Sequence, residues 1–77
     1  MARNIQMIHS FTYDSNEHRD VVLGKVYTQK SSFSTLEKAV EDARKWIAKS
    51  ETWMDVTTSA VKIINKETKE MLWSWEA

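Results

Sequence analysis

The sequence predicts an α+β domain of the order ββαββ, with one amphipathic helix packed on one face of a four-stranded antiparallel sheet. Two observations carry this prediction. A single helical period lies between residues 33 and 49, and alternating apolar and polar residues lie on both sides of it. With 77 residues we expect a single domain, 1–77, whose core is close to the smallest that folds alone. Chains of this size often bury further apolar area by associating.

The helix is predicted over residues 34–49. Ser34 occupies the position of an N-cap, and Glu37 follows three residues later, as in a capping box. Acidic residues come early and basic residues late, which the helix dipole favours. Six apolar residues recur with helical spacing and share one stripe that must be buried against the sheet: Leu36, Ala39, Val40, Ala43, Trp46 and Ile47.

An N-terminal hairpin is predicted over residues 4–28. Its first strand, 4–13, alternates between an apolar and a more polar face, and a polar run at 14–20 forms the loop. The second strand is predicted at 21–28, because VVLGKVYT is rich in β-branched residues. Gly24 would then lie in mid-strand, where a glycine indicates a bulge or the close approach of a bulky side chain such as Trp46.

A C-terminal hairpin is predicted over residues 58–76. Its strands are expected at 59–65 and 70–75, joined by the loop 66–69, and we predict a positive φ at Lys69. The role of residues 53–55, which include Trp53 and Met54, stays open between an edge strand, a helical turn and a lid. The strand order is also open, with either the second and fourth strands or the first and third strands at the centre of the sheet.

The register of the second hairpin decides which residues face the helix. A four-residue loop places Ile64 opposite Met71, and regular pairing then produces two faces. One face carries Val61, Ile63, Leu72 and Ser74, and the other carries Ala60, Lys62, Ile64, Met71, Trp73 and Trp75. One helix covers only one face, so the tryptophans lie either beneath the helix or on the open face. On the open face they would form an apolar patch larger than monomers normally expose.

The open face is the candidate site, because tryptophan, tyrosine and methionine are typical of the buried centre of a protein interface. We expect Lys62 to make a cation–π contact with Trp73 in this face. The partner is expected to be a second copy of the chain, in a homodimer, or another protein. Seven residues make up the predicted partner-binding site: Leu23, Tyr27, Lys62, Ile64, Met71, Trp73 and Trp75.

Composition argues against several other classes of function. Eleven basic and eleven acidic residues cancel, so no overall field attracts nucleic acid or an anionic membrane. The chain has no cysteine and one glycine, and it carries no nucleotide-binding, metal or catalytic motif, so we expect no cofactor and no metal. No apolar stretch is long enough for a membrane span, and we expect a cytoplasmic protein. His9 lies on the apolar face of its strand, where we expect a structural histidine.

The leading hypothesis is therefore a non-enzymatic protein-interaction module. A small accessory protein of a phage or mobile element, which inhibits or redirects a target protein by binding it, would have this compact and motif-poor character. Two alternatives stay open. The aromatic sheet face could stack the bases of single-stranded nucleic acid, although such platforms normally lie in a basic groove. A small ligand or substrate could instead bind between subunits, and an enzyme of that kind would need His9 in a polar cleft.

Overall fold

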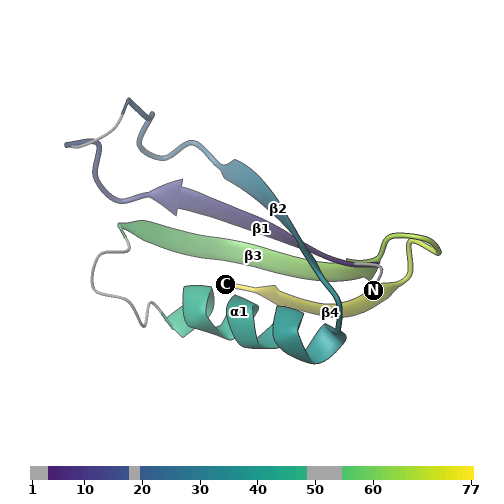
Figure 1. Cartoon of the computed structure of the whole chain (residues 1–77). Helices are drawn as coiled ribbons and strands as arrows, with labels where there is room; N and C mark the ends of the chain where they lie inside the picture. Colours follow the sequence, from purple (N-terminus) through teal and green to yellow (C-terminus); the bar gives the residue numbers. More distant parts are fainter. Residues whose placement is uncertain (1–3, 18–19, 49–54) are drawn as a thin grey trace.

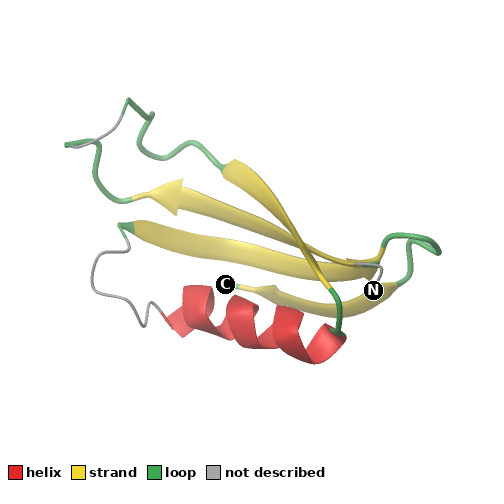
Figure 2. Cartoon of the chain, in the orientation of Figure 1, coloured by secondary structure: helices red, strands yellow, loops and turns green. Residues whose placement is uncertain are grey.

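The computed structural model describes residues 4–17, 20–48 and 55–77, and it confirms the ββαββ order. The strands are β1 (Ile5–Tyr13), β2 (Tyr27–Phe33), β3 (Val56–Asn65) and β4 (Met71–Glu76), and the helix is α1 (Leu36–Ala48). All neighbouring strands are antiparallel. The helix lies along one face of the sheet (Figures 1 and 2).

The sheet has the order β2-β1-β3-β4, so the first and third strands form its centre. This is one of the two arrangements that the sequence left open. The central strands are the ones with the strongest alternation, since Met7, His9 and Phe11 are buried on β1 and Val61 and Ile63 on β3. A central position suits strands that supply the core, whereas the edge positions go to β2 and β4.

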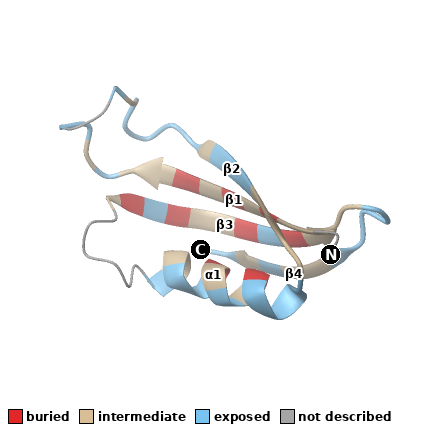
Figure 3. Ribbon diagram, viewed as in Figure 1, coloured by how far each residue is buried: buried red, intermediate tan, exposed pale blue. Residues whose placement is uncertain are grey.

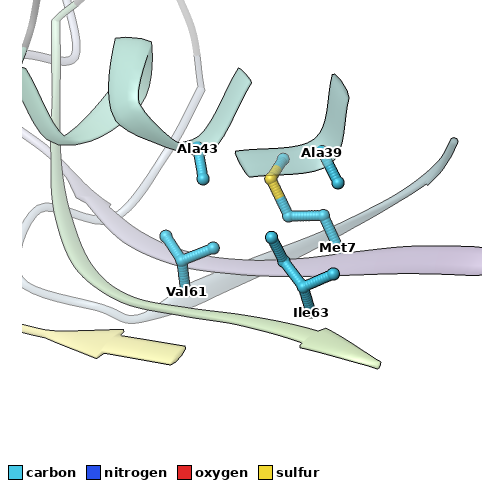
Figure 4. Packing of buried hydrophobic residues seen from close by; sticks show 5 residues of the cluster. All are labelled: Met7, Ala39, Ala43, Val61 and Ile63. Carbon is cyan, nitrogen blue, oxygen red and sulfur yellow. The ribbon is translucent and has the colours of Figure 1, made fainter. Parts of the chain in front are cut away.

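The core lies between α1 and the two central strands (Figures 3 and 4). Met7, Val61 and Ile63 pack against Ala39 and Ala43 of the helix, and all five are buried. The two alanines have almost no side chain, so the helix backbone approaches the sheet closely at this point. The remaining residues of the predicted helical stripe are less enclosed: Val40, Trp46 and Ile47 pack around the core, and Leu36 is exposed.

The second strand lies later in the chain than predicted. It was expected at 21–28, but β2 runs from Tyr27 to Phe33 and pairs with β1 from Phe11↔Tyr27 to Ile5↔Phe33. An edge strand with one solvated face does not need the β-branched residues on which the prediction relied. Gly24 lies instead in a turn with φ 85°, and the expected contact with Trp46 is wrong, because a Cβ at Gly24 would meet no atom within 4 Å.

The helix is also capped one residue later than predicted. The backbone N–H of Lys38 donates to Oγ1 of Thr35 at 3.2 Å, and the N–H of Ala39 donates to the carbonyl of Thr35 at 3.3 Å. These bonds make Thr35, and not Ser34, the N-cap. The helix therefore starts at Leu36, two residues after the predicted start, and it ends at Ala48. The predicted last residue, Lys49, lies outside the described residues.

The loop of the second hairpin confirms the predicted backbone conformation. Lys69 has φ 64°, and it is the only residue other than glycine with a positive φ in the described ranges. The loop is closed at Asn65, whose N–H donates to the carbonyl of Glu70 at 2.9 Å and whose Oδ1 accepts from the N–H of Glu67 at 2.9 Å. The strands around it extend further than predicted, since β3 begins at Val56 and β4 ends at Glu76.

The position of the cap can be tested by substitution. Thr35→Ala should lower the free energy of unfolding by about 1 kcal/mol, because the N–H of Lys38 loses its side-chain acceptor. Urea denaturation followed by circular dichroism measures this change. Ser34→Ala is the matched control and should be close to neutral; a larger loss for Ser34→Ala than for Thr35→Ala would contradict the assignment.

The strained residue of the hairpin loop provides a second test. Lys69→Gly should raise the free energy of unfolding by about 0.5–1 kcal/mol, because glycine adopts a positive φ without a Cβ clash. The same denaturation experiment measures the gain. Lys66→Gly in the same loop has no positive φ to relieve and should be neutral or destabilising, so equal gains at both positions would argue against strain at Lys69.

Candidate interaction surface

A β-bulge in β4 changes the predicted arrangement of the tryptophans. Ile64 pairs with Met71, as predicted, but the register then shifts by one residue at Leu72. Trp73 therefore pairs with Ile63 and Trp75 pairs with Val61. Directly paired residues share a face of the sheet. Both tryptophans consequently lie on the face that the helix covers, and Trp73 packs against the core.

The predicted composition of the two faces is therefore wrong. Val61 and Ile63 were expected on the face opposite to Trp73 and Trp75, and the bulge places all four together. Lys62 pairs with Ser74 and faces away from the helix, so it cannot make the predicted cation–π contact with Trp73.

The open face of the sheet carries mainly polar side chains. Met71 is its one large hydrophobic residue with more than half of its surface exposed (54%), while Ile8 and Ile64 are half-buried. The expected aromatic platform is absent from this face in the described strands. The register places the following residues on it: Gln6, Ile8, Ser10, Thr12, Thr28, Lys30, Ser32, Thr57, Ala60, Lys62, Ile64, Met71, Ser74 and Glu76.

Among the described residues, the largest group of exposed apolar side chains lies in the connection between β1 and β2. We call its residues 20–26 the apex loop. Val22, Leu23 and Val26 are 61%, 49% and 58% exposed. The connection projects beyond the end of the sheet (Figure 1). The radius of gyration, 13.2 Å, exceeds the value of about 11.5 Å that is typical of a compact chain of this length.

Tyr27 anchors the apex loop to the sheet. Its hydroxyl accepts a hydrogen bond from the N–H of Val22 at 3.0 Å, and its ring packs edge-on against Tyr13, with ring centroids 5.2 Å apart. Nζ of Lys25 lies 5.2 Å from the centroid of the same ring, which is a cation–π contact. These contacts fix the base of the loop, while Val22, Leu23 and Val26 have no such cover.

His9 lies in the core beneath the helix and joins the helix to the sheet through a polar chain. It is 1% exposed, and its Nε2 lies 2.7 Å from Oγ1 of Thr58. The Thr58 hydroxyl donates to the carbonyl of Trp46 at 3.3 Å, so its oxygen accepts from Nε2–H of His9. The imidazole also packs against the rings of Trp46 and Phe11, with centroids 4.7 and 4.8 Å away.

This arrangement suits the neutral imidazole. Nδ1 of His9 is buried without a hydrogen-bond partner, so protonation would place an unsatisfied N–H in the core. Burial lowers the pKa of His9 below its usual value of 6.5, and the nearby carboxylate of Asp42 opposes this shift only in part. In the described part of the chain, no group of three histidine or acidic side chains is placed to hold a metal ion.

The seven predicted partner-binding residues are thus divided among three places. Leu23 and Tyr27 lie in or below the apex loop, and Lys62, Ile64 and Met71 lie on the open face. Trp73 and Trp75 lie on the covered face at the β4 edge. Sequence reasoning missed Val22 and Val26 as surface residues because it placed them in a strand. The turn-forming glycine between them was the signal for a loop. Trp53 and Met54 lie outside the described residues.

Comparisons of this chain with protein-family models, with curated proteins and with solved structures find no match. The helix in the described part of the chain is too short and too polar to cross a membrane.

The environment of His9 predicts a pH dependence of stability. Because its pKa is lower in the folded chain, the unfolded chain binds the proton first as the pH falls. The contribution of His9 to the free energy of unfolding should be constant well above pH 6.5, where both states are neutral, and should decrease as the pH falls through that value until folded His9 is protonated. Urea midpoints measured between about pH 7.5 and pH 5.5 follow this change.

The two histidines of the chain provide the control for that measurement. His18→Gln should keep the pH dependence, and His9→Gln should remove most of it at the cost of lower stability at neutral pH. A flat pH profile for His18→Gln would show that His9 titrates normally. NMR titration of the ring protons of His9 in the His18→Gln variant measures the pKa directly.

Proposed function

We propose that this protein is a non-enzymatic, cytoplasmic interaction module that binds a target protein by inserting its apex loop into an apolar groove. The observation that carries the proposal is the exposure of Val22, Leu23 and Val26 within five residues of one projecting loop. Monomers often expose single apolar side chains, but a contiguous group on a projection is typical of a binding site.

The energy available from this contact is sufficient for recognition. Burying the exposed half of a valine or leucine side chain contributes about 1 kcal/mol, so the three side chains together supply about 3 kcal/mol. This is about a hundredfold in affinity. Because Tyr27 holds the backbone of Val22 in place, part of the ordering cost of the loop is met before binding.

The charges of the apex loop indicate the chemistry of the partner. Its described residues include one acid, Asp20, and one base, Lys25, and Lys25 already faces the ring of Tyr27. Such a loop presents no net charge, which favours an uncharged apolar groove over a polyanion. The separation of Lys62 from Trp73 and Trp75 removes the aromatic, basic platform on which the nucleic-acid alternative depended.

The location of His9 also favours a binding role. Its imidazole is enclosed by Thr58, Trp46 and Phe11, and it faces the core of the domain rather than a cleft. A small domain with one projecting apolar loop suits a protein that blocks or redirects its target by covering a surface. An accessory protein of a phage or mobile element would act in this way.

The proposal can be tested by site-specific photo-crosslinking. A benzophenone amino acid at Leu23 should cross-link to one protein in the cells that produce this chain, whereas the same group at Glu37, on the exposed side of the helix, should not. The cross-linked protein is then purified for binding measurements. Val22→Asp and Val26→Asp should weaken its binding at least tenfold and leave the thermal midpoint unchanged, because both residues are exposed.

Thr28→Asp is the matched control, since it adds the same charge to an exposed residue of β2 outside the apex loop. It should bind normally. Affinity should change little with salt, in contrast to the steep loss expected for nucleic acid. Equal cross-linking at Leu23 and Glu37, or full binding by Val22→Asp, would contradict the proposed role of the apex loop.

A further inference from the structure

The outer edge of β4 is an unpaired strand edge that carries two tryptophans. Within the described strands, β4 pairs only with β3, so one side of its backbone has no strand beside it. Trp73 and Trp75 are half-buried, and α1 packs mainly on β3 and β1. Edge strands of this kind accept a further strand through their free N–H and C=O groups.

The register shows which backbone groups of β4 point outward. The N–H of Ala77 donates to the carbonyl of Ser59 at 2.9 Å, so Ala77 faces β3. Because the direction alternates along an antiparallel strand, Trp73 and Trp75 also direct their backbone groups toward β3. Ser74 and Glu76 therefore direct their N–H and C=O groups outward, away from the sheet.

We propose that β4 pairs antiparallel with β4 of a second copy of this chain, with Ser74 on the two-fold axis. In this register Ser74 faces Ser74 of the second copy, and the two residues exchange both backbone hydrogen bonds. Trp73 then faces Trp75 of the second copy, and Trp75 faces Trp73. The two-fold axis is perpendicular to the sheet, so all four tryptophans lie on the face that carries the helices.

The distance between the two helices of the dimer leaves room for the tryptophan side chains. Strands lie about 4.8 Å apart, so helices centred over β1 and β3 in the two copies would be about 19 Å apart. A helix with its side chains is about 10 Å across, which leaves a trough about 9 Å wide between the helices. The four tryptophans would fill this trough.

The other edge of the sheet does not offer an equivalent pairing. Lys30 lies at the middle of β2 and is exposed. A two-fold pairing that used the whole of β2 would place Lys30 opposite itself, and like charges in that position destabilise a strand pair. An exposed lysine is also a common device that protects an edge strand from pairing. The β4 edge has no charged residue between Met71 and Trp75.

This dimer is independent of the apex-loop proposal, because it forms without a target protein. The two surfaces are compatible, since β4 and the apex loop lie on different parts of the molecule (Figure 1). Antiparallel pairing would direct the two apex loops toward opposite ends of an eight-stranded sheet. The dimer would then present two binding loops that point away from each other.

The solution mass tests the proposal. Sedimentation equilibrium of the full chain, up to about 100 µM, should give twice the monomer mass of 9.0 kDa. Ser74→Pro removes the outward N–H and should raise the dissociation constant at least tenfold. The monomer fold should be retained, because proline is tolerated where the N–H of an edge strand faces outward. Circular dichroism checks that the variant is folded.

A pair of charge variants keeps the test decisive if Ser74→Pro fails to fold. Ser74→Lys and Ser74→Glu should each associate more weakly than the wild type, and an equimolar mixture should restore the dimer. Thr28→Lys on the β2 edge is the control and should stay dimeric. A wild-type mass of 9.0 kDa at about 100 µM would overturn the proposal, and so would a dimer that is insensitive to Ser74→Lys.

Discussion

One helix of 13 residues can cover only one face of a four-stranded sheet, so the large apolar side chains of the strands must reach that face. Regular strands of this sequence could not bring all of these side chains to the same face. Val56 and Val61 are separated by an odd number of positions, and residues so separated point to opposite faces of a regular strand. The fold resolves this conflict with two breaks in register, each of which exchanges the faces of the residues beyond it.

The break in register between β1 and β3 places Val56 and Thr58 on the covered face, the same face that carries Val61 and Ile63. The burial of Val56 and the polar chain from His9 through Thr58 to Trp46 both depend on this shift. With regular pairing, Thr57 and Ser59 would face the helix instead. His9 would then lose the Thr58 hydroxyl that accepts its Nε2–H, because Thr58 would point to the open face. The bulge therefore decides both the packing and the polar contacts of the core.

Local signals in the sequence predicted the helix, the first strand, the second hairpin and the conformation of Lys69. These features depend on spacing, turn chemistry and Cβ sterics within a few residues. Local signals could not locate the bulges. Their positions depend on how the whole sheet brings its apolar side chains to one face. The odd spacing of Val56 and Val61 shows that a break is needed, but not which residue is the extra one. The candidate site depended on regular pairing, and this explains why Trp73 and Trp75 changed faces.

The placement of β2 shows that the packing of the core outweighs local β propensity. VVLGKV has the higher β propensity, yet the polar segment from Tyr27 to Phe33 pairs with β1. Phe33 reaches the core only if the strand ends just before the helix, and two residues then connect it to Leu36. Pairing residues 21–28 with β1 would leave a longer connection and remove Phe33 from the core. The burial of Phe33 in the core therefore leaves Val22, Leu23 and Val26 outside the sheet, where they are available to a partner.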